Sequence, residues 1–113
     1  MGRNLLVMLV FSILCNSAQA GGLREIQKAL ESRDREERAK AVTKLSEMQG
    51  KVPLLLLIEA IADEDAVVRA RACRGLSGRR SPADQEIIAS RGTRHRSPLV
   101  RKACFAALAA ERV

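Results

Sequence analysis

The chain has 113 residues, of which 47% are hydrophobic, and it carries a formal net charge of +7. This length allows one domain at most, with a small core and a thin stability margin. No Cys, His or carboxylate cluster has the spacing of a metal site, and no Gly-rich phosphate loop follows a strand. We therefore expect no cofactor and no catalysis, and we expect the single histidine, His95, to be a neutral, solvent-exposed loop side chain.

The first 20 residues are typical of a secretory signal peptide. Arg3 gives a short positive start, residues 5–14 are apolar except for Ser12, and Ala18-Gln19-Ala20 forms a small-x-small cleavage site. The apolar stretch is too short to cross a bilayer of roughly 30 Å. We expect residues 1–20 to be removed and residues 21–113 to form a secreted or periplasmic domain without a transmembrane segment.

One short phrase occurs three times, over residues 38–45, 68–76 and 100–108. The arginines of these copies, Arg38, Arg69 and Arg101, are separated by 31 and 32 residues. A fixed period of this size is typical of stacked helical repeats, which bind partners far more often than they catalyse reactions.

The predicted helices alternate between phrase helices and partner helices. Asp34, Asp65 and Ser97 stand four residues before the three arginines, where they are good helix N-caps. Partner helices are predicted over residues 23–32, residues 52–62 and residues 81–90, the last two with a proline near the start. The order is thus half a repeat, two helical pairs and a closing helix.

The pattern Asp65-x-x-Val68-Arg69-x-x-Ala72-x-x-Gly75-Leu76 resembles the HEAT-repeat family, in particular the short-period HEAT-like repeats first associated with phycobilisome lyases. The resemblance covers essentially the whole mature chain. It implies an all-α fold, a short right-handed α-solenoid of antiparallel helix pairs. The shared motif is a packing motif, so it does not imply lyase activity.

The resemblance also implies a structural role for the repeated arginines. Arg38, Arg69 and Arg101, with Asp34 and Asp65 at the helix starts, are expected to form a ladder of hydrogen bonds between neighbouring repeats. Ser97 replaces the aspartate in the third copy, so the ladder is expected to be weaker at Arg101. In the first copy Glu37 replaces the valine found in the other two, which favours a more exposed first repeat.

Positive charge is concentrated in the second half of the chain. Residues 21–65 hold eight Lys/Arg and ten Asp/Glu, whereas residues 66–113 hold eleven and three. One interpretation is a solvated surface that keeps the protein soluble; another is a site for an anionic polymer, either nucleic acid or a cell-envelope polyanion. The lack of Trp and Tyr for base stacking argues against nucleic acid. The candidate side chains are Arg74, Arg79, Arg80, Arg91, Arg94, Arg96 and Lys102, with the two loops at residues 79–80 and 91–96 expected at opposite edges of the stack.

A protein partner is the leading functional hypothesis, and two surfaces are candidates. One is the partner-helix face with Leu55, Leu56 and Glu59, although these leucines equally fit burial between helices. The other is the C-terminal phrase helix, because no further helix follows it and its apolar side chains need a cover. That surface would bind a partner or a second copy of the chain, or an Ala-rich helix simply tolerates exposure there; its residues are Leu99, Ala103, Phe105 and Ala106.

Two cysteines remain after removal of the signal peptide, Cys73 and Cys104. Cys104 takes the central apolar position of its phrase, and Cys73 is one position later and is turned by roughly 100°. Stacked helices lie about 8–10 Å apart, whereas bridged Cα atoms lie within about 7 Å. Two small buried thiols are therefore expected rather than a disulfide. Taken together, the sequence predicts an exported, non-catalytic module for protein–protein interaction or scaffolding.

Overall fold

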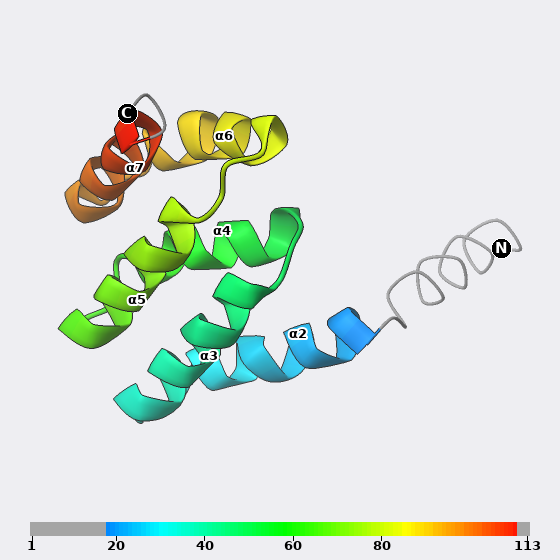
Figure 1. The fold of residues 1–113 in the computed structure, drawn as a ribbon. Coiled ribbons are helices and arrows are strands. Elements are labelled where there is room, and N and C mark those ends of the chain that lie inside the picture. Colours follow the sequence, from blue (N-terminus) through cyan, green and yellow to red (C-terminus); the bar gives the residue numbers. More distant parts are fainter. Residues whose placement is uncertain (1–17, 111–113) are drawn as a thin grey trace, which may run out of the picture.

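A computed structural model describes residues 18–110, with side chains from Gly22 onward. The expected signal peptide therefore lies outside the described residues, apart from Ala18–Ala20, which open the first helix. Figure 1 shows the order of the elements, which are all helical in this part of the chain. They are α2 (Ala18–Leu30), α3 (Arg35–Glu47), α4 (Lys51–Ala60), α5 (Ala66–Ser77), α6 (Pro82–Ile87), the π-helix η1 (Ile88–Gly92) and α7 (Pro98–Ala110).

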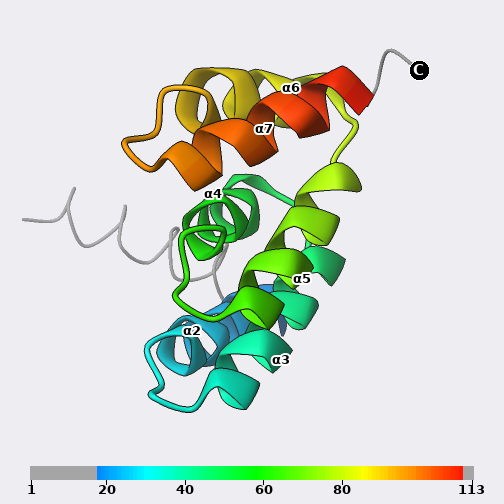
Figure 2. The ribbon, with the colours of Figure 1, turned by 90° about the vertical axis from the view of Figure 1, so that its left-hand side faces the viewer.

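The helices form two layers. The three phrase helices α3, α5 and α7, called the first helices below, lie side by side and run in the same direction (Figures 1 and 2). The second helices α2, α4 and α6 with η1 lie behind them and return the chain. The loop before α6 and the loop before α7 lie at opposite ends of the helices, as expected (Figure 2). The predicted stack of antiparallel helix pairs is confirmed.

The core forms where the two layers meet. On α5 the apolar and small residues of the repeated phrase are buried. Val68 and Ala72 are 0% exposed, Leu76 is 1% exposed, and Gly75 is buried beside them. Of the corresponding residues of α7, Val100, Cys104 and Ala107 are buried and Leu108 is partly buried. From the second layer, α4 contributes the largest share of buried aliphatic side chains. These are Leu54, Leu57 and Ile58, with Ile61 just beyond the helix.

A glycine sets the distance between the first two phrase helices. A Cβ added to Gly75 of α5 would lie 2.8 Å from Ser46 Cβ of α3 and 3.1 Å from Leu57 Cδ2 of α4. Side chains do not tolerate such contacts, so the helices approach this closely only because position 75 has no side chain. The small residue in the repeated phrase thus fixes how tightly the repeats stack.

The starts of α3, α5 and α6 are capped as the sequence predicts. The Asp34 carboxylate accepts the Glu36 N–H (3.0 Å), and Asp65 accepts the N–H groups of both Val67 and Val68 (3.1 Å each). Ser81 caps α6 by accepting the Asp84 N–H at 3.2 Å. These acceptors satisfy amides that have no partner within the helix.

Replacing Asp65 with alanine tests the strongest of these caps. Because Asp65 serves two amides, we expect Asp65→Ala to lower the free energy of unfolding by about 1–2 kcal/mol, and Asp34→Ala to lower it by about 0.5–1 kcal/mol. Urea unfolding followed by circular dichroism measures both. Equal losses in the two variants would contradict the assignment of two capped amides to Asp65.

The second helix of the second pair departs from the predicted single α-helix over residues 81–90. The α-helical part ends at Ile87 and the chain continues as a π-helix to Gly92, closed by a hydrogen bond from the Thr93 N–H to the Ile88 carbonyl at 3.2 Å. The wider turn brings Gly92 directly against Cys104 of α7. This contact helps to join α7 to the preceding helical pair.

Candidate functional site

A loop motif repeats together with the helices. Ser32, Asp63 and His95 occupy equivalent positions before α3, α5 and α7, and each side chain accepts the backbone N–H two residues later at 2.9–3.1 Å. The carbonyl of each of these residues then accepts a hydrogen bond from the repeated arginine six residues further on, at 2.8–2.9 Å. The repeated arginine therefore secures the loop in front of its own helix.

Only Arg38 also bonds forward along the stack. Its Nε donates to Asp63 Oδ2 at 3.0 Å and its Nη2 donates to Asp63 Oδ1 at 3.2 Å, in the loop that leads to α5. This hydrogen bond and the attraction of the carboxylate raise the pKa of Arg38 above its ordinary value. The ladder implied by the family resemblance is thus present at its first step, but its acceptor is Asp63, whereas the expected partners Asp34 and Asp65 cap helices.

The prediction that the ladder continues at Arg69 is wrong, and within the described residues Arg101, the last of the three arginines, bonds to its own loop. Arg69 Nη1 donates to the carbonyls of Asp63 (2.8 Å) and Glu64 (2.9 Å), and Arg101 makes the corresponding bonds to the loop before α7. The reason lies in the third loop, where His95 stands at the position of Asp63. An imidazole in place of a carboxylate gives Arg69 no forward anion to bind.

His95 is not the exposed loop side chain that the sequence predicted. Its ring is 14% exposed, its Nδ1 accepts the Ser97 N–H at 3.0 Å, and its Nε2 lies 2.9 Å from Glu59 Oε1. Since Nδ1 accepts, the neutral ring carries its proton on Nε2 and donates it to Glu59. His95 and Glu59 therefore join the loop before α7 to α4, which is a structural role.

Arg79 is also a structural residue, which corrects its selection as a surface binding candidate. It is 4% exposed, and its Nη2 donates to the carbonyls of Met48 and Leu45 at the end of α3, the latter at 3.4 Å. Its Nη1 lies 3.8 Å from Asp84 Oδ2. The loop before α6 places this side chain inward, where it caps a helix of the preceding pair, while its neighbour Arg80 stays exposed.

The other basic candidates lie on the surface but do not form one site. Arg74 of α5 and Lys102 of α7 are exposed on the first helices. The remaining exposed candidates, Arg80, Arg91, Arg94 and Arg96, are divided between the two ends of the helices, as the antiparallel arrangement predicted.

The groove of the second helices lies between α2 and α4. It has a volume of about 280 Å³ and is lined by Leu56 and Glu59 among the predicted candidates, while Leu55 is half-buried and does not line it. Leu56 packs against the core, and Glu59 holds His95. These two candidate side chains thus already have partners within the fold.

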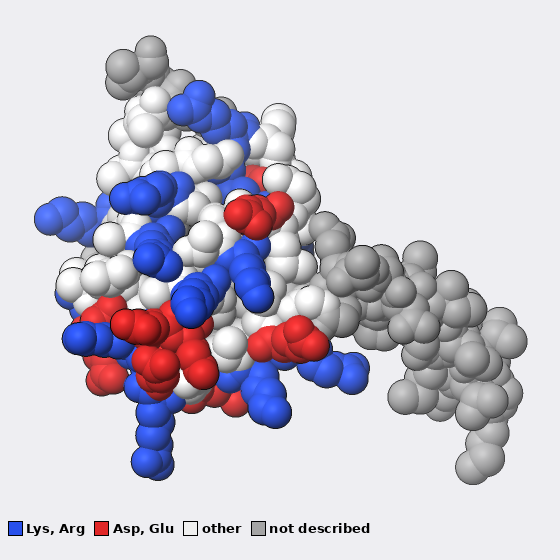
Figure 3. Space-filling view, turned by 60° about the horizontal axis from the view of Figure 1, so that its bottom comes forward, with Lys and Arg blue, Asp and Glu red and all other residues white. Residues whose placement is uncertain are grey.

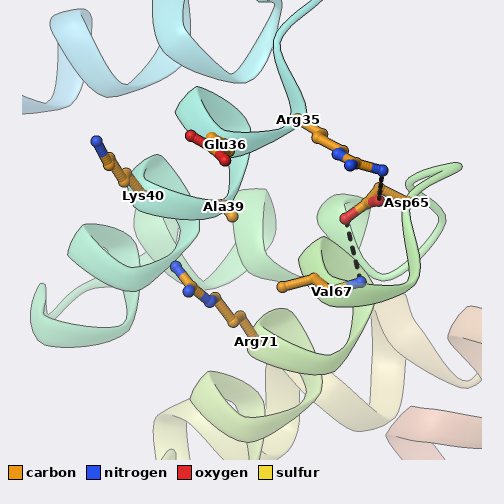
Figure 4. A pocket seen from close by; sticks show the side chains of 7 residues that line it. All are labelled: Arg35, Glu36, Ala39, Lys40, Asp65, Val67 and Arg71. Atoms are coloured by element: carbon orange, nitrogen blue, oxygen red, sulfur yellow. Dashed lines mark hydrogen bonds and ion pairs between the residues drawn. The ribbon is translucent and has the colours of Figure 1, made fainter.

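A larger groove, which the sequence analysis missed, lies between the first helices α3 and α5. It contains two pockets of about 450 Å³ and 480 Å³, and Arg71 lines both of them. Figure 4 shows Arg71 extending from α5 toward α3, where its Nη1 donates to Thr43 Oγ1 at 3.2 Å. At the other end an ion pair between Arg35 and Asp65, 4.0 Å apart, spans the groove (Figure 4).

Several residues that line this groove are at equivalent positions of successive repeats, and we call these positions on α3, α5 and α7 the outer stripe. At the repeat spacing, Glu36 corresponds to Val67 and Leu99. In the same way Lys40 corresponds to Arg71 and Ala103, and Thr43 corresponds to Arg74 and Ala106. The stripe runs from polar through basic to apolar. Its members are Glu36, Lys40 and Thr43 on α3, Val67, Arg71 and Arg74 on α5, and Leu99, Ala103 and Ala106 on α7.

Two of the most exposed large apolar side chains belong to the outer stripe. Val67 is 54% exposed and Leu99 is 53% exposed, and Phe105 elsewhere on α7 is 59% exposed. Figure 3 shows how charge is distributed over one face, with Lys and Arg spread across it and Asp and Glu gathered mainly at an edge. Single exposed apolar side chains are common on protein surfaces, so what distinguishes Val67 is its place in the groove beside Arg71.

Cys73 and Cys104 are both free thiols. Cys104 is fully buried, as its central position in the phrase predicts, and Cys73 is half-buried. Burial, with a smaller contribution from the nearby Cys73 thiol, raises the pKa of Cys104 to about 11. Burial also raises the pKa of Cys73, and Arg69 partly opposes this.

Native alkylation should distinguish the two thiols. At pH 8 we expect iodoacetamide to modify Cys73 slowly and to leave Cys104 unmodified, because Cys104 is inaccessible and almost entirely protonated. Both should react after denaturation, as peptide mapping by mass spectrometry would show. Modification of Cys104 at its denatured rate would contradict the buried placement.

The raised pKa of Cys104 also predicts how stability depends on pH. Since an unfolded thiol ionises near pH 9 and the folded one near pH 11, the free energy of unfolding should fall as the pH rises from 9 toward 11.

Within residues 18–110, no cluster of His, Cys, Asp and Glu has the arrangement of a metal site. In the same part of the chain no helix combines the length and the apolar character needed to span a membrane.

The comparisons agree with the architecture. The model of the HEAT-repeat family matches residues 23–109. This range covers most of α2, all of the helices from α3 to η1, and α7 except for its last residue. Neither a curated protein nor a solved structure matches the chain. The period, the two helical layers and this match lead to one conclusion: the chain belongs to the HEAT-repeat family.

Proposed function

We propose that this protein is an exported, non-catalytic module that binds a partner protein through the outer stripe of its first helices. HEAT repeats generally mediate protein–protein interaction or scaffolding. The observation that carries the proposal is the groove between α3 and α5, where exposed Val67 and the cations Arg71 and Arg74 stand together. The period of 31–32 residues further favours the short-period HEAT-like branch, without any lyase activity.

Two matched valine variants test the location of the site. Val67 is 54% exposed on the outer stripe and Val52 is 46% exposed on α4, so glutamate at either position is tolerated by the fold. After crosslinking in cells that produce the protein, the wild type and Val52→Glu should retain the same partner, and Val67→Glu should lose it. Loss with Val52→Glu alone would favour the second helices and overturn the proposed face.

The proposed export rests on the pattern of residues 1–20. Intact-mass measurement of the protein from a secreting host should give a chain that starts at Gly21, and Ala18→Arg should block this processing because the site requires small residues. Recovery of the full-length chain inside the cell would overturn the proposal.

Capture of an anionic polymer is the second candidate function, favoured by the eleven Lys/Arg against three Asp/Glu in residues 66–113. The two functions differ in their response to salt. Polyanion binding should fall by orders of magnitude, roughly 10³-fold or more for several phosphate contacts, between 50 and 200 mM salt. Protein binding that includes apolar contacts should change far less.

The C-terminal surface adds a proposed self-association. Phe105 stands at the repeat position of Val42 and Cys73, which are buried and half-buried, yet Phe105 is 59% exposed. We therefore propose that a second copy covers α7 at high concentration. Sedimentation should show a dimer that Phe105→Glu abolishes, and an unchanged monomer in both proteins would exclude it.

A further inference from the structure

The outer stripe changes character along the stack in a way that specifies its partner. At its centre, Val67, Arg71 and Arg74 share one side of α5, since they are spaced i, i+4 and i+7. On α7 the equivalent positions are all apolar, beginning with Leu99. On α5 the two arginines thus share a face with exposed Val67, and the corresponding face of the neighbouring helix α7 begins with exposed Leu99.

We propose, resting on the function proposed above, that the partner presents an acidic amphipathic helix that lies along α5. Its carboxylates face Arg71 and Arg74, and its apolar side chains cover Val67 and Leu99. This mode is recognition of a helix in a groove, in which anchors at i, i+3 or i+4 and i+7 meet a complementary surface.

The dimensions of the site suit a helix. The groove follows α5 from Asp65 to Gly78, and α5 itself is roughly 18 Å long, which corresponds to about three helical turns. A helix packed there would rest on the side chains of α5 as neighbouring helices of a stack rest on each other. The first helices thus offer a partner the same type of contact that holds the repeats together.

The charges of the groove argue against a uniform polyanion. Glu36 and Asp65 line the end of the groove near the start of the helices, where they repel phosphates. Lys40, Arg71 and Arg74 lie further along, and the exposed Val67 and Leu99 have nothing to gain from a sugar–phosphate chain. A protein segment with separate acidic and apolar positions matches all of these side chains at once.

Peptide probes test this chemistry directly. The first is a labelled 14-residue helical peptide with leucine on one face and glutamate beside it; the others are a scrambled peptide of the same composition and a peptide with lysine in place of glutamate. Fluorescence anisotropy with the whole protein should show at least tenfold tighter binding of the first peptide than of either control. Equal binding of the scrambled peptide would overturn the proposal.

Matched charge reversals locate the binding. The double variant Arg71→Glu/Arg74→Glu should weaken binding of the acidic peptide about tenfold or more, because two attractive pairs become repulsive. The control Arg91→Glu/Arg94→Glu makes the same change in net charge on exposed residues of η1 and of the loop before α7, which do not line the groove, and should stay within twofold of the wild type. Equal losses in the two double variants would reduce the effect to net charge and overturn the proposal.

Leu99→Glu tests the apolar half of the site. It should weaken the acidic peptide several-fold, whereas the binding of an oligonucleotide or inorganic polyphosphate should follow charge alone. Binding of polyphosphate that is as tight as that of the peptide and equally sensitive to Arg71→Glu/Arg74→Glu would identify a polyanion site instead. If Val67→Glu abolishes partner capture in cells but the acidic peptide does not bind, the proposed partner chemistry is wrong and the proposed function stands. If Val67→Glu leaves partner capture intact, the proposed binding face is wrong as well.

Discussion

Replacing Arg79 with methionine is expected to lower the free energy of unfolding by about 3 kcal/mol. The substitution leaves the Asp84 carboxylate, whose side chain is 13% exposed, without its counter-ion and removes the donor to the Leu45 and Met48 carbonyls. Breaking a buried pair from one side typically costs about 3–5 kcal/mol, and we take the lower end because the Nη1 to Oδ2 distance is 3.8 Å. For a domain this small, such a loss is a large part of its total stability.

The neighbouring arginine supplies the control. Arg80 is exposed, so Arg80→Met should change stability by less than about 0.5 kcal/mol. The double variant Arg79→Met/Asp84→Ala should be no less stable than Arg79→Met, since it no longer contains an uncompensated carboxylate. Urea unfolding measures the stability of all three variants. Equal unfolding midpoints for Arg79→Met and Arg80→Met would contradict the stabilising contacts of the buried Arg79 side chain.

Gly92→Ala is expected to cost about 2–3 kcal/mol, the next largest effect. A Cβ at position 92 would lie 2.8 Å from Cys104 Cβ and closer still to its sulfur, both in the fully buried centre of α7. Core atoms that are already close-packed move apart only at a cost of about 1–3 kcal/mol. The displacement of α7 from η1 should therefore loosen the end of the stack.

Gly78→Ala is the matched comparison. A Cβ there meets only the Gly75 carbonyl oxygen, at an ordinary 3.6 Å, and the backbone has φ −79° and ψ −6°, which any residue adopts. We expect Gly78→Ala to be neutral or stabilising by up to about 1 kcal/mol. Thermal melts of the two variants decide the matter, and a Gly92→Ala melt equal to that of Gly78→Ala would refute the close packing of η1 on α7.

The sequence predicted the fold because the information that specifies it is local. Caps such as Asp34 and Asp65 act within three residues of a helix start, and the apolar positions of each phrase recur at helical spacing. The small residue at position 75 was identified for the same reason, and the structure shows its close contact with α3. Repetition then removed ambiguity, because three copies of one pattern must pack in one way.

The candidate site was predicted only in part, since it depends on which residues meet across helices. Among the basic candidates, Arg74 lines the groove of the first helices, but Arg71 beside it was not selected. Both lie on one side of α5, and only the position of α3 shows that this side borders a groove. A helical pattern in the sequence indicates an inward face and an outward face; it does not indicate where two outward faces meet.

What the sequence determined by itself was therefore the family, the helical stack and the positions of its caps and small residues, all of which depend on short-range chemistry and period. Only the tertiary structure decided the roles of individual polar side chains. Arg79 and Arg80 are adjacent and alike in sequence, yet one is buried and the other exposed. The physical reason is that a long cationic side chain goes where distant acceptors lie, and the Met48 carbonyl is brought to Arg79 by the stacking of one repeat on the next.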